Sequence, residues 1–206
     1  MNSKDHTPEA VLAFWFAGVG DDAAAIEARN RIWYGNDPAF DDEIRVRFGA
    51  LVEAAERGAL KLWKLSPAGT LALIVVCDQF PRNIFRATPR AFALDPRAQA
   101  LARDAVAQGQ DRELGLVERS FFYLPFEHAE DRQAQALSLR CFEQLHAETP
   151  ETLRSFSADA LHWSRDHHDV IARFGRFPHR NLVLDRVSSA DELAWLAAHR
   201  NNYGQG

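Results

Sequence analysis

Two polar motifs that lie far apart in the chain carry the side chains best suited to chemistry. The first is DQFPRN at residues 78–83, and the second is FGRFPHRN at residues 174–181. Each places a Phe-Pro step, which disfavours a regular helix, just before an arginine and an asparagine. A planar guanidinium beside an amide can hold the oxygens of a carboxylate or a phosphate. The ligand-binding candidates are therefore Arg82, Asn83, Arg176, His179, Arg180 and Asn181.

Three further side chains are candidates for acid–base catalysis: Asp78, Glu127 and His128. Asp78 ends the apolar run 71–77, where an unpaired carboxylate would cost free energy. Its expected partner is an arginine, and the candidates are Arg82, Arg176 and Arg180. Glu127 and His128 lie in aromatic surroundings, and a histidine beside a carboxylate in a partly dry pocket can exchange a proton near neutral pH.

The same residues also fit a purely structural role. Buried ion-pair networks that shift pKa values are frequently structural, and such a network would fix how the helices meet. The neighbouring arginines Arg86, Arg90 and Arg186 are interpreted as ordinary solvated side chains. At the level of sequence, a polar pocket and a satisfied network remain equal alternatives.

Metal chemistry is not favoured by the spacing of the candidate ligands. Glu143 with His146, and Asp159 with His162, each put a carboxylate and a histidine three residues apart, as in di-iron bundles. A proline at position 150 restarts a helix between the two pairs, and the matching inward glutamates of such bundles are missing. We interpret the two pairs as coincidental and expect no metal and no cofactor.

Residues 71–78 are the one segment with two structural interpretations. The run could form a buried strand that ends in an acidic residue, as in a nucleotide-binding sheet. That interpretation requires a glycine-rich phosphate loop, and the chain contains neither GxxxxGK[ST] nor GxGxxG. Because the run follows Ser66-Pro67, a typical helix start, we predict a buried central helix instead.

Length, composition and charge predict one cytoplasmic globular domain over residues 1–206, with a core at about 9–196. The formal net charge of -5 disfavours nucleic acid as a partner, and no apolar run is long enough to cross a membrane. Residues 1–6 have no apolar segment of the signal-peptide type. Cys77 and Cys141 have apolar neighbours, which predicts buried, unreactive thiols in a reducing compartment.

Helix signals recur along the whole chain and predict an all-α fold of about nine or ten helices in stacked hairpins, without a significant sheet. Prolines 8, 38, 67 and 96 follow capping residues and are separated by 30, 29 and 29 residues, and Thr149-Pro150 repeats the pattern. Helical spacing from Phe156 to Phe174 places His167 and Trp163 on one apolar face, so His167 is expected to face the core. Ser189 begins a predicted capping box with Glu192.

Four motifs together resemble a known family. They are VLAFWF at 11–16, DQFPRN at 78–83, FYLPFEHAE at 122–130 and FGRFPHRN at 174–181. The chain resembles, over about residues 9–196, an uncharacterised bacterial family catalogued as domain of unknown function nine hundred and twenty-four. That family is grouped with tetratricopeptide-like helical folds, so the resemblance implies stacked helical hairpins and no particular activity. Asp185 stands where the family commonly has glycine, which puts the geometry of that turn in question.

Three functions are consistent with these residues. The favoured one is binding of an anionic small molecule or an acidic peptide by the arginine, histidine and asparagine side chains. The alternatives are a small cofactor-free hydrolase or lyase that uses Asp78, Glu127 or His128, and a purely structural network in an interaction scaffold. If the stack has an exposed apolar end, Phe14, Trp15 and Phe16 could cover it in a homodimer; the alternative is a monomer in which these rings belong to the chain's own core.

Overall fold

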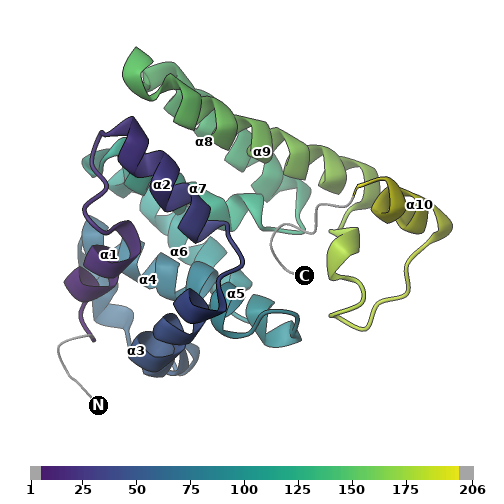
Figure 1. Cartoon of the computed structure of the whole chain (residues 1–206), viewed down its shortest axis with the longest axis horizontal. Helices are drawn as coiled ribbons and strands as arrows, with labels where there is room; N and C mark the ends of the chain where they lie inside the picture. Colours follow the sequence, from purple (N-terminus) through teal and green to yellow (C-terminus); the bar gives the residue numbers. More distant parts are fainter. Residues whose placement is uncertain (1–5, 200–206) are drawn as a thin grey trace.

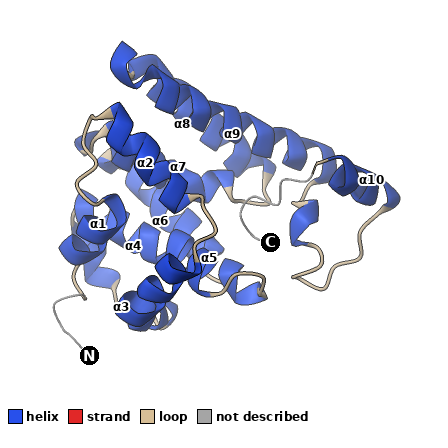
Figure 2. Cartoon of the chain, viewed as in Figure 1, coloured by secondary structure: helices blue, strands red, loops and turns tan. Residues whose placement is uncertain are grey.

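The computed structural model describes residues 6–199, which form helices joined by short loops (Figure 1). No residue of that range lies in a strand (Figure 2), which confirms the predicted all-α fold and shows that the strand interpretation of residues 71–78 is wrong. The helices are α1 (Pro8–Phe16), α2 (Ala23–Trp33), α3 (Pro38–Glu56), α4 (Pro67–Ile74), α5 (Phe80–Ile84), α6 (Asp95–Ala107), α7 (Leu116–Glu127), α8 (Arg132–Glu148), α9 (Arg154–Phe174) and α10 (Ala190–Ala198). Short 3-10 turns lie at Lys61–Leu65, Pro89–Phe92, Gln110–Glu113, Glu151–Leu153 and Pro178–Arg180.

Three of the five predicted capping residues are confirmed, and two are wrong. Thr7, Asp37 and Ser66 each accept a backbone N–H with the side chain and are followed by proline. Asp95 is instead the first residue of α6, and its buried carboxylate pairs with an arginine rather than capping the helix. Thr149 ends α8 and donates its hydroxyl to the carbonyl of Leu145 at 2.6 Å. In both cases the side chain takes part in a tertiary or local hydrogen bond instead of capping a helix.

The first Phe-Pro step does not interrupt its helix, contrary to the prediction. Helix α4 continues through a π-helical turn, Val75–Gln79, directly into α5. In this turn the N–H of Phe80 bonds to the carbonyl of Val75, five residues back. Pro81 has no N–H and would crowd the carbonyl four residues before it, and the wider turn relieves that conflict. Asp78 therefore lies within a continuous helix and not in a loop.

The second Phe-Pro step lies where an α-helix has ended, as predicted. Gly175 ends α9 in the left-handed conformation, and Pro178 begins the 3-10 turn that contains Arg180. Asp185 has a φ of 52°, which explains why a glycine would suit this position, since an L-residue pays a steric cost there. The predicted capping box of Ser189 and Glu192 starts α10.

An aromatic core holds the N-terminal half together. Trp15 is fully buried, with ring centroids 5.7 Å from Phe80 and 5.9 Å from Phe121. Phe16 is 5% exposed, and its ring lies 5.2 Å from that of Phe121. These rings are part of the chain's own core, so the predicted use of this segment to cover a partner in a homodimer is not supported by the surface.

The helices α8 and α9 run side by side as a long hairpin, and α10 lies near one end of it (Figure 1). The segment between α9 and α10 folds back onto the end of α7. Glu130 fixes it there, because its carboxylate accepts from Arg186 at 2.6 and 2.9 Å and from the N–H of Phe177 at 2.8 Å. This attachment brings Arg180 next to His128, whose carbonyl accepts from Arg180 at 3.1 Å.

Within residues 6–199, no helix combines the length and the apolar character needed to cross a bilayer.

The aromatic core makes a direct prediction about stability. Phe48 is fully buried and lies 5.0 Å from both Phe14 and Phe80, measured between ring centroids, so Phe48→Ala should lower the free energy of unfolding by about 3–5 kcal/mol. Leu62 is 69% exposed, and Leu62→Ala should change the free energy of unfolding by less than about 0.5 kcal/mol. Urea unfolding followed by circular dichroism measures both, and equal losses would contradict this placement of the core.

Candidate functional site

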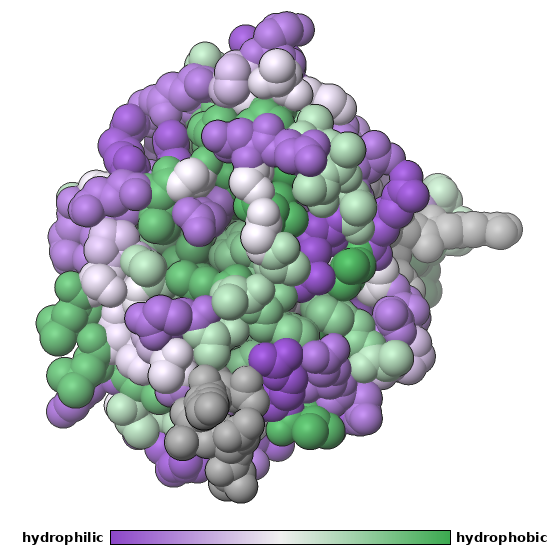
Figure 3. Space-filling view, turned by 60° about the vertical axis from the view of Figure 1, so that its left-hand side comes forward, coloured by the Kyte–Doolittle hydropathy of each residue, from purple (hydrophilic) through white to green (hydrophobic). Residues whose placement is uncertain are grey.

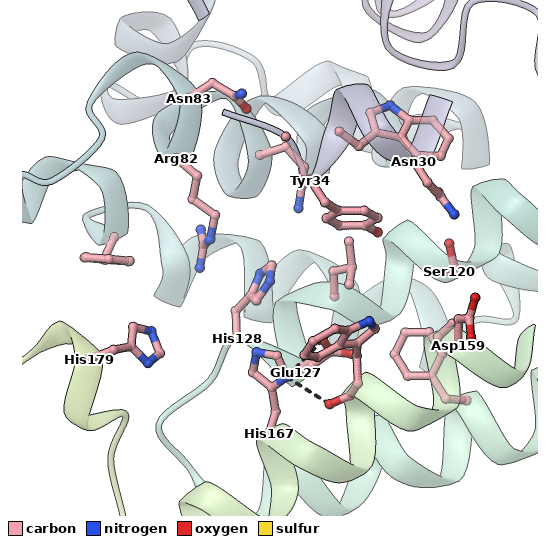
Figure 4. A pocket seen from close by; sticks show the side chains of 18 of the residues that line it. Asn30, Tyr34, Arg82, Asn83, Ser120, Glu127, His128, Asp159, His167 and His179 are labelled. Carbon is pink, nitrogen blue, oxygen red and sulfur yellow. Dashed lines mark hydrogen bonds and ion pairs between the residues drawn. The ribbon is translucent and has the colours of Figure 1, made fainter. Parts of the chain in front are cut away.

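A cavity of about 390 Å³ lies between α2, α5, α7, α9 and the 3-10 turn of residues 178–180. Its volume is within the range of about 300–1,000 Å³ that is usual for small-molecule sites. Cationic and titratable side chains gather around one part of it, and aromatic side chains form much of the remainder (Figure 4). The lining includes Tyr34, Arg82, Asn83, Phe92, Glu127, His128, Phe142, Phe156, Trp163, His167, His179 and Arg180.

A buried carboxylate–histidine pair lies at the cationic part of the cavity. Nδ1 of His128, at the end of α7, lies 2.9 and 3.0 Å from the two carboxylate oxygens of Asp78 in the π turn. Asp78 is 1% exposed, accepts from Gln79 at 2.6 Å and forms an ion pair with Arg82 at 3.3 Å. Burial raises the pKa of Asp78, but Arg82, His128 and Gln79 outweigh that effect and hold the pKa well below its ordinary value. Asp78 is therefore a permanent anion at neutral pH.

His128 has the arrangement of a general base. Burial, and then the charge of Arg82, lower the pKa of His128 despite the opposing effect of Asp78, so the ring is neutral at neutral pH. The neutral ring donates from Nδ1 to Asp78 and carries its lone pair on Nε2. Its side chain lines the cavity and is 16% exposed. The carboxylate that orients His128 is therefore Asp78, from a different helix, and not the adjacent Glu127.

Glu127 faces a second histidine. Its Oε1 lies 3.4 Å from Nδ1 of His167, and both side chains line the cavity (Figure 4). Burial and the nearby carboxylates of Asp78 and Asp166 raise the pKa of Glu127 to about 8. Burial and His128 lower the pKa of His167 to about 3, and its Nδ1 donates to the carbonyl of Trp163 at 2.9 Å. At neutral pH Glu127 is predominantly a protonated acid, beside a histidine that is neutral.

Two arginines share one aspartate beside these pairs. Arg82 donates to both oxygens of Asp95, at 2.8 and 3.0 Å, and to the carbonyl of Asp78 at 2.7 Å. Arg180 lies only within 3.5 Å of the same Asp95 carboxylate, and its Nε has no hydrogen-bond partner. Burial lowers the pKa of Arg180 to about 10, and Arg82 contributes in the same direction. The guanidinium of Arg180 is thus a buried cation with incomplete compensation.

The structure brings some of the sequence-predicted residues to the cavity and leaves others outside it. Arg82, Asn83, His179 and Arg180 line the cavity, although the amide of Asn83 is already bonded to Asp41 at 2.7 Å. Burial, and then the charge of Arg180, lower the pKa of His179 to about 2, so its ring is neutral.

Two residues of the second motif have a different role. Arg176 donates to both oxygens of Glu192, at 2.7 and 2.8 Å, and Asn181 donates to Ser188 at 3.0 Å. Neither residue lines the cavity, and of the three candidate arginines it is Arg82, not Arg176, that pairs with Asp78. Both side chains bind partners within residues 176–192, and these hydrogen bonds hold the segment in place.

The aromatic lining is the part of the site that sequence analysis missed. Phe156, Trp163 and His167 do share one face of α9, as their spacing predicted, but this face borders the cavity rather than solid core. Trp163 is 41% exposed and Tyr34 is 59% exposed. Periodicity could identify the face of α9, whereas nothing in the sequence near Tyr34 indicates a site.

The two expected coincidental pairs on α8 and α9 do not converge. His146 bonds to Ser157 at 2.8 Å, and Asp159 borders the cavity. Among the residues that the structure describes, no group of three or more His, Cys, Asp or Glu side chains is placed to hold a metal ion. Cys77 is fully buried, and burial raises the pKa of its thiol to about 12, so it is an unreactive thiol as predicted.

Comparison with known proteins identifies the family. The sequence pattern of a family described as bacterial protein of unknown function (DUF924) matches residues 11–200. The chain belongs to this family. A solved structure of a protein of unknown function from Agrobacterium tumefaciens is similar to it, with a TM-score of 0.75 and 37% sequence identity over 84% of this chain and 93% of that chain. Among curated proteins there is no match. The motif resemblance is confirmed, whereas the tetratricopeptide-like stacking stays a prediction.

The raised pKa of Glu127 makes the stability of this DUF924 protein depend on pH. Glu127 has a pKa of about 8 in the folded chain and an ordinary value of 4.5, so folding favours its protonated form and stability is lost as pH rises towards 8. The lowered pKa values of His128, His167 and His179 act in the opposite direction, because stability rises as pH rises through their ordinary value of 6.5. From pH 6.5 to 8 the wild type should therefore lose about 2 kcal/mol of unfolding free energy relative to Glu127→Gln, in which the three histidines are unchanged.

Urea unfolding at a series of pH values measures this difference. Asp166→Asn is the matched control, because it removes one neighbouring charge but keeps the Glu127 carboxyl. Its slope should lie between those of the wild type and of Glu127→Gln. Parallel slopes in the wild type and in Glu127→Gln would show that Glu127 is ionised throughout.

Proposed function

We propose that the cavity binds a small organic anion through Arg180. The observation that carries this proposal is a guanidinium that lines the cavity between two aromatic rings and has only a long ion pair, at 3.5 Å, to Asp95. A buried, poorly compensated cation costs free energy, and an incoming carboxylate or phosphate would remove that cost.

The surroundings of Arg180 prepare it for such a ligand. Phe92 and Phe177 pack against its guanidinium carbon, with ring centroids at 4.6 and 4.5 Å. Rings on the faces of a guanidinium leave its N–H groups for partners in its own plane, which is the geometry of carboxylate recognition. Asp95 is already bonded twice to Arg82, so it offers Arg180 only a long ion pair.

The enclosure of the cavity by helices favours a free small molecule over an acidic peptide. Arg82 supplies further positive potential next to Arg180, and the neutral ring of His128 supplies hydrogen-bonding capacity. Since most of the lining is apolar, the binding energy would come from ring contacts, and the arginine would supply orientation.

Anion binding is tested by the thermal stability of three proteins. Phosphate, acetate and larger carboxylates should raise the melting temperature of the wild type. At a ligand concentration one hundred times Kd, binding adds about 2.7 kcal/mol to the free energy of unfolding. Arg180→Met should lose this response and keep or gain basal stability, because it replaces an uncompensated buried charge. Arg176→Met should melt lower, since it strands the buried Glu192, but should keep the full response. A wild type that responds to none of the anions would refute the proposal.

A second function, cofactor-free acid–base catalysis, is favoured by the Asp78–His128 pair. A neutral histidine oriented by a buried carboxylate can remove a proton from water or from a bound substrate, and protonated Glu127 can supply one. This arrangement suits a hydrolase or lyase, with Arg180 stabilising the negative charge that develops.

Catalysis is tested with 4-nitrophenyl esters of short acids. The rate should rise with pH as His128 loses its proton and decline again towards pH 8 as Glu127 ionises. It should be about 10²–10⁴-fold lower in His128→Gln and unaffected by chelators. Asp78→Asn should also lower the rate, because His128 would lose the acceptor that orients it. Rates that are equal in the wild type and in His128→Gln would leave the site as a binding site alone.

A further inference from the structure

We propose that the natural ligand of this cavity is an aromatic carboxylate, whose acid group meets Arg180 and whose rings lie along α9. This inference rests on the proposed anion binding and adds the chemical class of the ligand. It depends on the distribution of lining residues, on the exposure of two large side chains and on the length of the aromatic wall.

The lining is divided by character. Arg82 and His179 lie on one side of the cavity, whereas His128, His167 and Glu127 lie nearer its middle and Asn30, Ser120 and Asp159 lie on the opposite side (Figure 4). Apart from these last three polar residues, the wall away from the cationic side is aromatic and aliphatic, from Trp33, Tyr34, Leu124, Phe142, Phe156, Ala160 and Trp163. A ligand that satisfies both parts must join an anionic group to an apolar body.

The aromatic wall has a length that can be derived from helix geometry. Phe156, Ala160, Trp163 and His167 all line the cavity and follow one face of α9. At about 1.5 Å of rise per residue, the distance from His167 to Phe156 along the axis is roughly 16 Å. A cavity that follows this face has room for two rings beyond the acid group.

Two of the lining rings are left partly in solvent. Trp163 is 41% exposed and Tyr34 is 59% exposed, although both are lining residues. Hydrophobic residues also gather in the middle of one face of the molecule, with hydrophilic residues around them (Figure 3). Large apolar side chains beside a cavity commonly mark a ligand surface, and an aromatic body in contact with Trp163 and Tyr34 would remove them from water.

The charge of the site selects an acid rather than a neutral aromatic molecule. The buried ions near the cavity are Arg82, Arg180, Asp78 and Asp95, and Glu127 is predominantly protonated at neutral pH. Arg180 has only a long ion pair, at 3.5 Å, to Asp95. A carboxylate would complete the hydrogen bonds of Arg180, whereas an amine would face two arginines.

The test uses three acids that share one carboxymethyl group and differ in the number of rings: acetate, phenylacetate and biphenyl-4-acetate. Dissociation constants come from NMR titration, which also follows weak binding. Each added ring should lower Kd by at least about tenfold in the wild type, because each buries further apolar surface. Arg180→Met should weaken all three acids.

Trp163→Ala separates the ring contacts from the acid contacts. Because Trp163 is partly exposed, the fold should persist, which circular dichroism verifies, and Leu62→Ala is a control at an exposed leucine far from the lining. Trp163→Ala should weaken phenylacetate and biphenyl-4-acetate about tenfold or more and leave acetate unchanged. The matched alcohol 2-(biphenyl-4-yl)ethanol should bind at least about tenfold more weakly than biphenyl-4-acetate.

The outcomes distinguish this inference from the proposed function. If acetate binds through Arg180 and added rings bring no gain, the aromatic class is wrong and anion binding stands. If the alcohol binds as tightly as the acid, or if Trp163→Ala binds all three acids like the wild type, the inference is also overturned. If none of the acids binds, the proposed function fails first.

Discussion

The buried carboxylate of Asp78 is the group on which the arrangement of the site depends. It lies in a π turn inside the central helix and is almost completely excluded from solvent, so its charge must be matched by partners from elsewhere in the fold. Arg82 supplies a cation one turn further along, and His128 supplies an N–H from the end of α7. The position of α7 relative to the central helix is thereby fixed by hydrogen bonds as well as by aromatic packing.

The consequences of that charge extend to groups that it does not touch. Its negative potential helps to keep Glu127 protonated. Arg82 pairs with both Asp78 and Asp95, so Asp95 forms only a long ion pair with Arg180. The cavity consequently presents a neutral acid, a neutral oriented base and an incompletely paired cation within one largely apolar enclosure.

The attachment of the C-terminal segment is a condition for this site. Glu130 accepts from Arg186 and from the backbone of Phe177, and Arg176 joins the turn to α10 through Glu192. These ion pairs lie outside the cavity and hold the 3-10 turn that carries Arg180. The polar residues of FGRFPHRN therefore have two roles: Arg176 and Asn181 hold the turn, and His179 and Arg180 face the cavity.

Much of the fold and part of the site are determined by the sequence alone. Periodicity, proline and capping residues predict the helices, because these signals act through local backbone geometry. The same signals predict a buried His167, and the apolar flanks of Cys77 predict an unreactive thiol. The requirement that Asp78 has an arginine partner follows from the cost of a buried charge, and Arg82 meets it. The tertiary structure alone decided which carboxylate orients His128, that Arg176 binds Glu192, and that the aromatic face of α9 borders a cavity. These outcomes depend on the relative placement of helices far apart in the chain, and the hydrogen-bonding capacity of an arginine or a histidine is the same for every carboxylate that could reach it.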